Sequence, residues 1–277
     1  FNIKLISTTN NWIDMNEKVT FSFGENWEDY LNSVAEDEIE EAKEDIQKWL
    51  SNEEVNDKSI LDIGSGSGIH SLAFQLLGAK EILSVDYDIA SVRATSYIRD
   101  NFGREQNWSV EQGSILDDNF IEKYKDKFDI IYSWGVLHHT GNMDLAIENT
   151  IKLAKNNSTI WISIYQAGPR YEKDLKLKRF YNNQSDFFKK VILRFYIIRI
   201  MLGRLRRGWN PFKWNVKVFR GMNMYNNLID WLGGLPYEVA DSAYIVEKFK
   251  PHGFYLTGIE SRIEGACSIY KLERKKL

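Results

Sequence analysis

The sequence predicts an α/β fold with a doubly wound, seven-stranded, mostly parallel sheet and a helical insertion after strand five. Between residues 59 and 165, short runs of β-branched and other apolar residues alternate with runs whose apolar side chains recur every three or four positions. Several of the strand runs are apolar without interruption, which is typical of parallel strands that helices cover on both faces.

A helix at residues 33–50 is expected to precede the sheet. Its apolar residues recur at helical spacing, and acidic residues occupy the opposite face. The apolar positions are Ala35, Ile39, Ala42, Ile46, Trp49 and Leu50. An aromatic cluster at residues 21–30 lies just before this helix and is expected to pack it onto the main domain.

The first half of the alternation begins with a strand at residues 59–63, which ends in a glycine-rich turn. A helix at 69–77 follows, then a second strand at 81–85 and a second helix at 89–101. Residues 108–112 have a weaker β pattern and are expected to form the third strand.

The fourth strand is expected at residues 128–133, which are almost wholly apolar. A helix follows at 143–154, where Asn142 is placed to cap the first turn. The fifth strand, at 159–165, is rich in isoleucine and tryptophan, which pack well on a buried sheet.

The alternation lapses at residues 166–240, which are basic, aromatic and mostly helical in composition. It resumes with a helix at about 241–250 and strands at 254–259 and 266–272, so the lapse is an insertion into one domain. The chain therefore divides into an N-terminal helical extension or lid (1–55), an α/β core (56–165 and 241–277) and a helical cap (166–240).

Composition excludes several classes of protein. Apolar residues make up 43% of the chain and charged residues 27%, so disorder and fibrous repeats are not expected. The one cysteine, Cys267, cannot form an internal disulfide, and with four histidines it offers few ligands for a structural zinc site. Without a long apolar segment or a signal-peptide pattern, we expect a cytoplasmic protein.

The most informative segment is the turn after the first strand, where Gly64, Gly66 and Gly68 alternate with serine and Asp62 precedes them. Such glycines let the backbone pass close to a ligand, and the turn leads into a helix N-terminus. The dinucleotide-binding pattern would need its third glycine at position 69, which is Ile69. The spacing therefore disfavours a nicotinamide-dependent reductase.

An acid followed by glycines at alternate positions resembles the first motif of the class I S-adenosylmethionine (SAM) dependent methyltransferases. The expected second strand leads directly to Asp86, where a carboxylate can accept both ribose hydroxyls of an adenosine. The alternative role of Asp86 is to cap the helix that follows, for which Asp88 is a competing candidate.

Two later segments extend the resemblance. Residues 111–117 look like the family's adenine loop, in which Ser114 or Asp117 would bond the exocyclic amine and Ile115 would cover the ring. Residues 128–139 look like its fourth motif. The resemblance implies a Rossmann-like methyltransferase fold with an antiparallel last strand, SAM as cofactor and no metal. The cofactor-binding residues it implies are Asp62, Gly64, Ser65, Gly66, Gly68, Asp86, Tyr87, Ser114, Ile115, Asp117, Ser133 and Trp134.

The chemistry that SAM requires is mainly alignment and exclusion of water, because its methyl group is already bound to a positive sulfur. A base is needed when the acceptor must lose a proton, as a hydroxyl does. His139 and His138 follow the fourth strand and are the candidate bases; the alternative is that they only hold the loop. The segment lacks the Asn/Asp-Pro-Pro-aromatic run typical of nucleobase amine methylation, which disfavours nucleic acid as acceptor.

The charges are unevenly distributed. Residues 1–60 carry 15 acids and 5 bases, whereas residues 165–220 carry 15 bases and 3 acids. Three interpretations of the basic insertion remain open: a cap over an anionic or glycan-like small molecule, a membrane-surface helix that presents a lipid-linked acceptor, or an RNA-binding patch. Apolar residues surround the helix expected at 187–207, which favours its burial in protein.

We therefore expect a SAM-dependent methyltransferase that acts on a small molecule, with oxygen as the preferred acceptor atom. The alternatives are an RNA or lipid-linked acceptor, and a SAM-fold protein that binds without catalysis. The intact glycines and Asp86 argue against a non-binding descendant. Trp27, in the N-terminal aromatic cluster, is a candidate to close over SAM.

Overall fold

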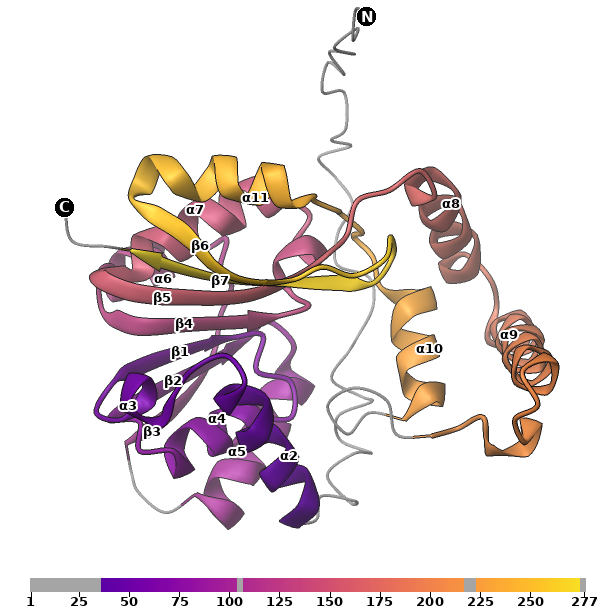
Figure 1. Ribbon diagram of the computed structural model, residues 1–277, viewed down its shortest axis with the longest axis horizontal. Helices are drawn as coiled ribbons and strands as arrows, with labels where there is room; N and C mark the ends of the chain where they lie inside the picture. The colour runs from indigo at the N-terminus through magenta and orange to yellow at the C-terminus, as the bar shows by residue number, and fades with distance from the viewer. Residues whose placement is uncertain (1–35, 104–106, 217–222, 275–277) are drawn as a thin grey trace, which may run out of the picture.

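The computed structural model describes residues 36–103, 107–216 and 223–274, so Trp27 and the aromatic cluster at 21–30 lie outside the described residues. One sheet of seven strands forms the centre of the described part, with helices on both of its faces. Further helices lie beyond the edge at which the parallel strands end (Figure 1).

The strand order in the sheet is β3-β2-β1-β4-β5-β7-β6. The strands are β1 (Ser59–Ile63), β2 (Glu81–Asp86), β3 (Trp108–Gln112), β4 (Phe128–Trp134), β5 (Ala154–Tyr165), β6 (Phe254–Glu260) and β7 (Cys267–Arg274). Strands β1 to β5 pair in parallel, and β7 runs antiparallel to both β5 and β6. The doubly wound sheet and its antiparallel last strand are thereby confirmed.

The core helices separate onto the two faces of the sheet. One face carries α2 (Glu36–Gln47), α4 (Ile69–Leu76) and α5 (Ile89–Phe102), with α3 (Asn52–Val55) leading into β1; the other carries α6 (Asp118–Tyr124), α7 (Met143–Leu153) and α11 (Ser242–Phe249). The expected cap of α7 is confirmed, because the Asn142 side chain accepts from the Leu145 amide at 3.1 Å.

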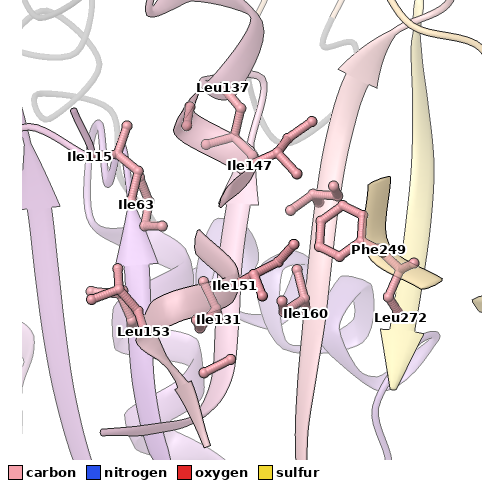
Figure 2. Close-up of a cluster of buried hydrophobic side chains, with 14 of the residues drawn as sticks. Ile63, Ile115, Ile131, Leu137, Ile147, Ile151, Leu153, Ile160, Phe249 and Leu272 are labelled. Atoms are coloured by element: carbon pink, nitrogen blue, oxygen red, sulfur yellow. The ribbon is translucent and has the colours of Figure 1, made fainter. Parts of the chain in front are cut away.

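The hydrophobic core consists of two layers because successive strand residues point to opposite faces of the sheet. Ile60, Ile82 and Ile130 pack under α2, α4 and α5. Their neighbours, among them Leu61 and Ile131, pack against α6, α7 and α11, and Figure 2 shows this second layer from Ile63 to Leu272. These layers fix the ends of β1, β2 and β4, from which the candidate site is built.

The insertion forms α8 (Tyr171–Asn182), α9 (Asp186–Arg206) and α10 (Met224–Gly233), and α9 lies on the outer side of the group (Figure 1). A small core of its own contains Tyr181, Leu193, Leu228 and Leu232. Within α9 only Leu193 is buried. The expectation that protein surrounds this helix is therefore wrong: its inner apolar side chains pack, and its outer ones are exposed.

A search of the described helices finds none with the length and apolar content needed to cross a membrane.

Candidate active site

The glycine-rich turn joins β1 to α4 and folds over the end of β2. The amides of Gly64 and Ser65 both donate to the carbonyl of Val85, at 2.7 and 3.2 Å. The Gly68 amide donates to the Ser65 carbonyl at 2.9 Å. Because all three bonds join backbone groups, the turn leaves the side chains of its residues available for other contacts.

Two of the glycines are required by close packing. A Cβ built on Gly64 would lie 2.2 Å from Cγ2 of Val136, in the loop after β4. A Cβ on Gly68 would lie 2.9 Å from the Cα of Thr95 in α5, and both glycines have positive φ. Ser65 adds a bond between its hydroxyl and that of Thr95, at 2.9 Å. The turn is therefore fixed against β4 on one side and α5 on the other.

Asp86 lies directly beside this turn at the end of β2. Its Oδ2 accepts from the Gly66 amide at 3.0 Å, and its Oδ1 accepts from the Asp88 amide at 2.9 Å. The helix cap of α5 is Asp88, whose side chain accepts from the Ala90 amide at 2.9 Å. The alternative role considered for Asp86, capping that helix, therefore belongs to Asp88.

The carboxylate of Asp86 keeps room for further hydrogen bonds. An ionised carboxylate has about four lone-pair sites; the two backbone amides occupy one on each oxygen, and the Ser91 hydroxyl is a further donor. Burial raises the pKa of Asp86 to about 6, against the lowering effect of those two amides. Hydrogen bonds from neutral hydroxyls would stabilise the ionised form of this buried carboxylate.

Asp62 lies beneath the turn, inside the protein. It is 2% exposed, and its Oδ2 accepts from the hydroxyl of Ser71 in α4 at 2.6 Å. The Ser71 hydroxyl also lies 2.7 Å from that of Ser84, which accepts from the Trp108 indole at 2.7 Å. The described contacts of Asp62 thus tie α4 to the sheet and support the turn from below.

The loop after β3 is joined to the end of β2, since the Gly113 amide donates to the Asp86 carbonyl at 3.0 Å. Within the loop, the Ser114 hydroxyl accepts from the amide two residues on, at 3.1 Å. The Asp117 side chain caps α6 by accepting from the amide two residues on, at 2.9 Å. The structure therefore brings Ser114 and Asp117 to the same edge as Asp86.

Two other residues implied as cofactor ligands differ sharply in exposure. Ile115 is 4% exposed and points into the core layer that Figure 2 shows, and its carbonyl accepts from the Asn149 side chain at 2.8 Å. Tyr87 is 65% exposed at the start of the loop after β2. Ile115 thus anchors the loop after β3 in the core instead of covering a ligand ring, whereas Tyr87 projects from the surface near Asp86.

The end of β4 lies next to the turn. The buried Ser133 hydroxyl donates to the carbonyl of Ile63 at 3.2 Å, and the half-buried Trp134 ring meets Trp161 edge-on with centroids 5.9 Å apart. A Cβ built on Gly135 would meet no described atom within 4 Å. Open space therefore begins where β4 ends, adjacent to the glycine-rich turn.

The two candidate bases lie side by side in the 3-10 turn Leu137–His139, with ring centroids 4.5 Å apart. His138 accepts at Nδ1 from the Tyr165 amide at 3.3 Å, so in the neutral ring its Nε2 carries the proton. His139 donates from Nδ1 to the Pro236 carbonyl at 2.5 Å, so its Nε2 carries the lone pair. The buried His138 Nε2 has no partner in the described part of the chain.

The end of β5 and the insertion together surround these rings. The Tyr165 ring lies 4.3 Å from His138, and the Tyr237 ring lies 5.1 Å from Tyr165. Lys178 of α8 reaches into this group with no exposed surface; its Nζ lies 4.6 Å from the Tyr237 centroid and 4.9 Å from the Trp231 centroid. Its ammonium also donates to the Trp231 carbonyl.

Burial controls the charge of this group. It lowers the pKa of Lys178 to about 7, and the nearby Asp174 opposes this shift. Burial, with the Lys178 charge as a second cause, lowers the pKa of His139 to about 3, and burial lowers that of His138 well below its usual range. Both imidazoles are therefore neutral at pH 7, while Lys178 is divided between its two forms.

Glu238 connects the end of the insertion to the same loop. Its amide donates to the His138 carbonyl at 3.0 Å, and its carboxylate accepts from the Met143 amide at 3.1 Å. Burial raises the pKa of Glu238 to about 7. The last residues of the insertion, Pro236 and Glu238, thus hold the histidine loop.

Sequence reasoning missed Lys178, although its position carries a signal. Leu175, Lys178 and Tyr181 are spaced three residues apart in α8 and are all buried, so the lysine falls on the apolar face of its helix. A lysine in such a stripe is rarely buried without a partner.

The residues at this edge of the sheet fit an adenosine sulfonium. The turn and the Asp86 carboxylate are neighbours, since Gly66 donates to Asp86, and the loop after β3 bonds to the same residue. The space beside Gly135 opens at the end of β4, the strand that leads into the histidine turn. A nucleoside held by Asp86 would therefore have its other end directed along the end of β4.

Comparison with known proteins bears on the same region. A family model described as a methyltransferase domain matches residues 54–209, more than half of the chain. A ribosomal protein L11 methyltransferase from Prochlorococcus marinus (strain AS9601) is 38% identical over 109 residues, which cover 39% of this chain and 35% of that protein. A protein of the same name from Pseudomonas fluorescens (strain SBW25) is 44% identical over 57 residues, or 21% of this chain and 18% of that one. The match thus spans about a third or less of these relatives.

Solved structures show the same fold. Magnesium protoporphyrin IX methyltransferase from Synechocystis PCC 6803, with bound SAH, superposes with a TM-score of 0.53 and 14% identity over 92% of this chain and 95% of that one. A SAM-dependent methyltransferase from Mesorhizobium loti gives a TM-score of 0.53 and 12% identity over 88% and 100% of the two chains.

Proposed function

The chain belongs to the class I SAM-dependent methyltransferases, and from this premise we propose that it transfers the methyl group of SAM to an oxygen of a small-molecule acceptor. SAM supplies a methyl group that is already activated by its positive sulfur. The observation that carries the acceptor proposal is the pair of buried imidazoles at the end of β4, which the insertion encloses.

On the cofactor side, the proposed roles follow from the contacts of the turn. Gly64, Gly66 and Gly68 give a backbone that a ligand can approach closely, and Asp86 accepts the two ribose hydroxyls. The loop of Ser114 and Asp117, which bonds to Asp86, lies beside the adenine. Ser133 and Trp134 border the space into which the methyl group points.

On the acceptor side, the two histidines take different roles because their proton positions differ. The lone pair of His139 Nε2 receives the proton of the acceptor hydroxyl, and the Nε2–H of His138 donates to the acceptor. Walls made by Tyr165, Tyr237 and Lys178 exclude water and restrict the acceptor to a small group.

A protein acceptor is the second candidate, because the relatives named above are ribosomal protein L11 methyltransferases. Their similarity covers 39% of this chain, and the enclosure of the histidines by the insertion favours a small acceptor. An assay of SAM with a panel of small hydroxylated metabolites, with L11 as a separate arm, distinguishes the two. Methylation of L11 alone would overturn the small-molecule proposal.

Replacing His139 by glutamine should lower kcat about 100-fold. This factor is at the lower end of the rate enhancement that a general base contributes, because the low pKa of His139 makes it a weak base. The KM for SAM should stay unchanged, since the cofactor roles are proposed for the turn and Asp86, whereas His139 bonds to Pro236 of the insertion. His138→Gln should raise the KM for the acceptor instead. Steady-state kinetics on both variants check this, and unchanged turnover in both would remove the histidines from the chemistry.

Binding of S-adenosylhomocysteine (SAH), the product, should depend on pH through Asp86. The ribose hydroxyls donate to the ionised carboxylate, and the free protein takes up a proton there below about pH 6. Affinity should therefore be constant above pH 7 and fall up to about tenfold per pH unit below 6. Calorimetric titrations from pH 5 to 8 measure this, and in Asp86→Asn the fall should vanish. An equal fall in that variant would assign it to another group.

A further inference from the structure

The outer face of α9 carries apolar side chains that no other part of the described chain covers. Phe187 is 70% exposed, Phe195 64% and Leu205 59%, and Val191, Ile198 and Leu202 are each more than 40% exposed. These six residues, the apolar stripe of α9, follow one another at steps of three or four, which places them on one side of the helix.

The stripe is long, and exposed aromatic residues also follow the helix in sequence. At 1.5 Å per residue, the 21 residues of α9 extend about 30 Å. Beyond them, Trp209 is 53% exposed and Phe212 is 80% exposed. An exposed apolar row of this length is typical of an interaction site rather than of free surface.

Basic residues border the stripe on both sides. With 100° between successive residues, Lys190 and Arg194 lie along one border and Arg199 and Arg206 along the other, and all four are exposed. Over residues 186–213 the sequence has eight bases and one acid, Asp186. The surface therefore combines apolar insertion with a strong positive charge.

The charges decide between possible occupants. A second copy of the chain that packed stripe against stripe would bring the two basic borders together, which is unfavourable. The phosphates of an RNA would pair with the lysine and arginine side chains. They would also face the row of aliphatic and phenylalanine side chains, which they cannot stabilise. An anionic bilayer surface satisfies both, because the apolar side chains enter the acyl boundary while arginine and lysine reach the headgroups.

We propose that the outer face of α9, with Trp209 and Phe212, binds to the surface of an anionic lipid bilayer. The inner face of α9 packs on α8 and α10 through Leu193 and its neighbours, so the helix would lie in the bilayer surface without leaving the domain. Trp209 suits the headgroup level, where its amphipathic ring is stable, and Arg204 and Arg207 lie 5.5 and 5.6 Å from that ring.

Sedimentation of the full chain with vesicles tests the proposal. We expect it to bind vesicles of phosphatidylcholine mixed with phosphatidylserine at low salt, to bind pure phosphatidylcholine far less, and to be partly released by high salt. In the triple variant Phe187→Ser/Phe195→Ser/Leu202→Ser, the partition coefficient between vesicles and water should fall at least about tenfold. Arg194→Gln/Arg199→Gln should lose mainly the portion of vesicle binding that salt abolishes.

A matched control removes exposed apolar surface elsewhere. Ile259 and Ile263 are 43% and 80% exposed near the ends of β6 and β7, and Ile259→Ser/Ile263→Ser should bind vesicles as the wild type does. All variants should keep their circular dichroism and SAH affinity, which shows that the domain is folded. Wild-type protein that stays in the supernatant with anionic vesicles would overturn the proposal. So would a dimer, or binding to bulk RNA, that the triple serine variant abolishes while vesicle binding persists.

Discussion

Replacing Asp86 by asparagine should weaken SAH binding by about 100-fold. Charge-assisted hydrogen bonds contribute about 1.5–3 kcal/mol each, and the carboxylate is proposed to accept two from the ribose. The asparagine also presents an NH2 group where Oδ1 or Oδ2 now accepts from the Asp88 or Gly66 amide. Isothermal titration of both proteins with SAH at pH 7.5 measures the loss.

The neighbouring acid provides the control. Asp88 caps α5, and asparagine is an equally good N-cap, so Asp88→Asn should keep both the fold and the SAH affinity. Equal losses in the two variants would mean that negative charge near the turn matters in general. An unchanged affinity in Asp86→Asn would contradict the assignment of the ribose site.

Replacing Lys178 by methionine should change how stability depends on pH. Between about pH 7 and 10.5 the unfolded chain keeps the lysine proton that the folded chain has lost, so wild-type stability rises with pH over this window. Methionine removes this dependence. The free energy of unfolding of the variant minus that of the wild type should therefore be roughly 4 kcal/mol larger at pH 6 than at pH 10.5.

This comparison isolates the buried ammonium, because costs that do not depend on pH cancel between the two conditions. Losing the bond to the Trp231 carbonyl is such a cost. Urea unfolding of both proteins at the two pH values gives the difference. Lys176→Met on the exposed side of the same helix is the matched control and should show none. A pH-independent difference for Lys178→Met would mean that the lysine is solvated in the folded protein.

The strands were predictable from the sequence where continuous apolar runs mark them. Ser59–Ile63 and Trp108–Gln112 have the expected bounds. β5 begins at Ala154 rather than at 159, because residues 155–158 are mostly polar and hide an extended segment from hydropathy. α6 was not expected, since its seven residues bury only Phe120 and Ile121, too few to give a period.

The glycine-rich turn could be located from the sequence because one local motif contains it. Glycine spacing located the turn, and the sequence placed Asp86 beside it; the structure adds that the Gly66 amide donates to Asp86 and that Asp88 caps the helix. The acceptor side could not be assembled in this way. His138, Lys178 and Tyr237 lie far apart in sequence and meet only through the packing of α8 and of residues 235–240 on β5.

A crystal structure of the complex with SAH is the decisive experiment for the cofactor site. We expect the nucleoside to lie against residues 64–68, both ribose hydroxyls to be within hydrogen-bond distance of the Asp86 carboxylate, and the sulfur to face the space at Gly135. SAH bound at another edge of the sheet, or with its ribose away from Asp86, would contradict it.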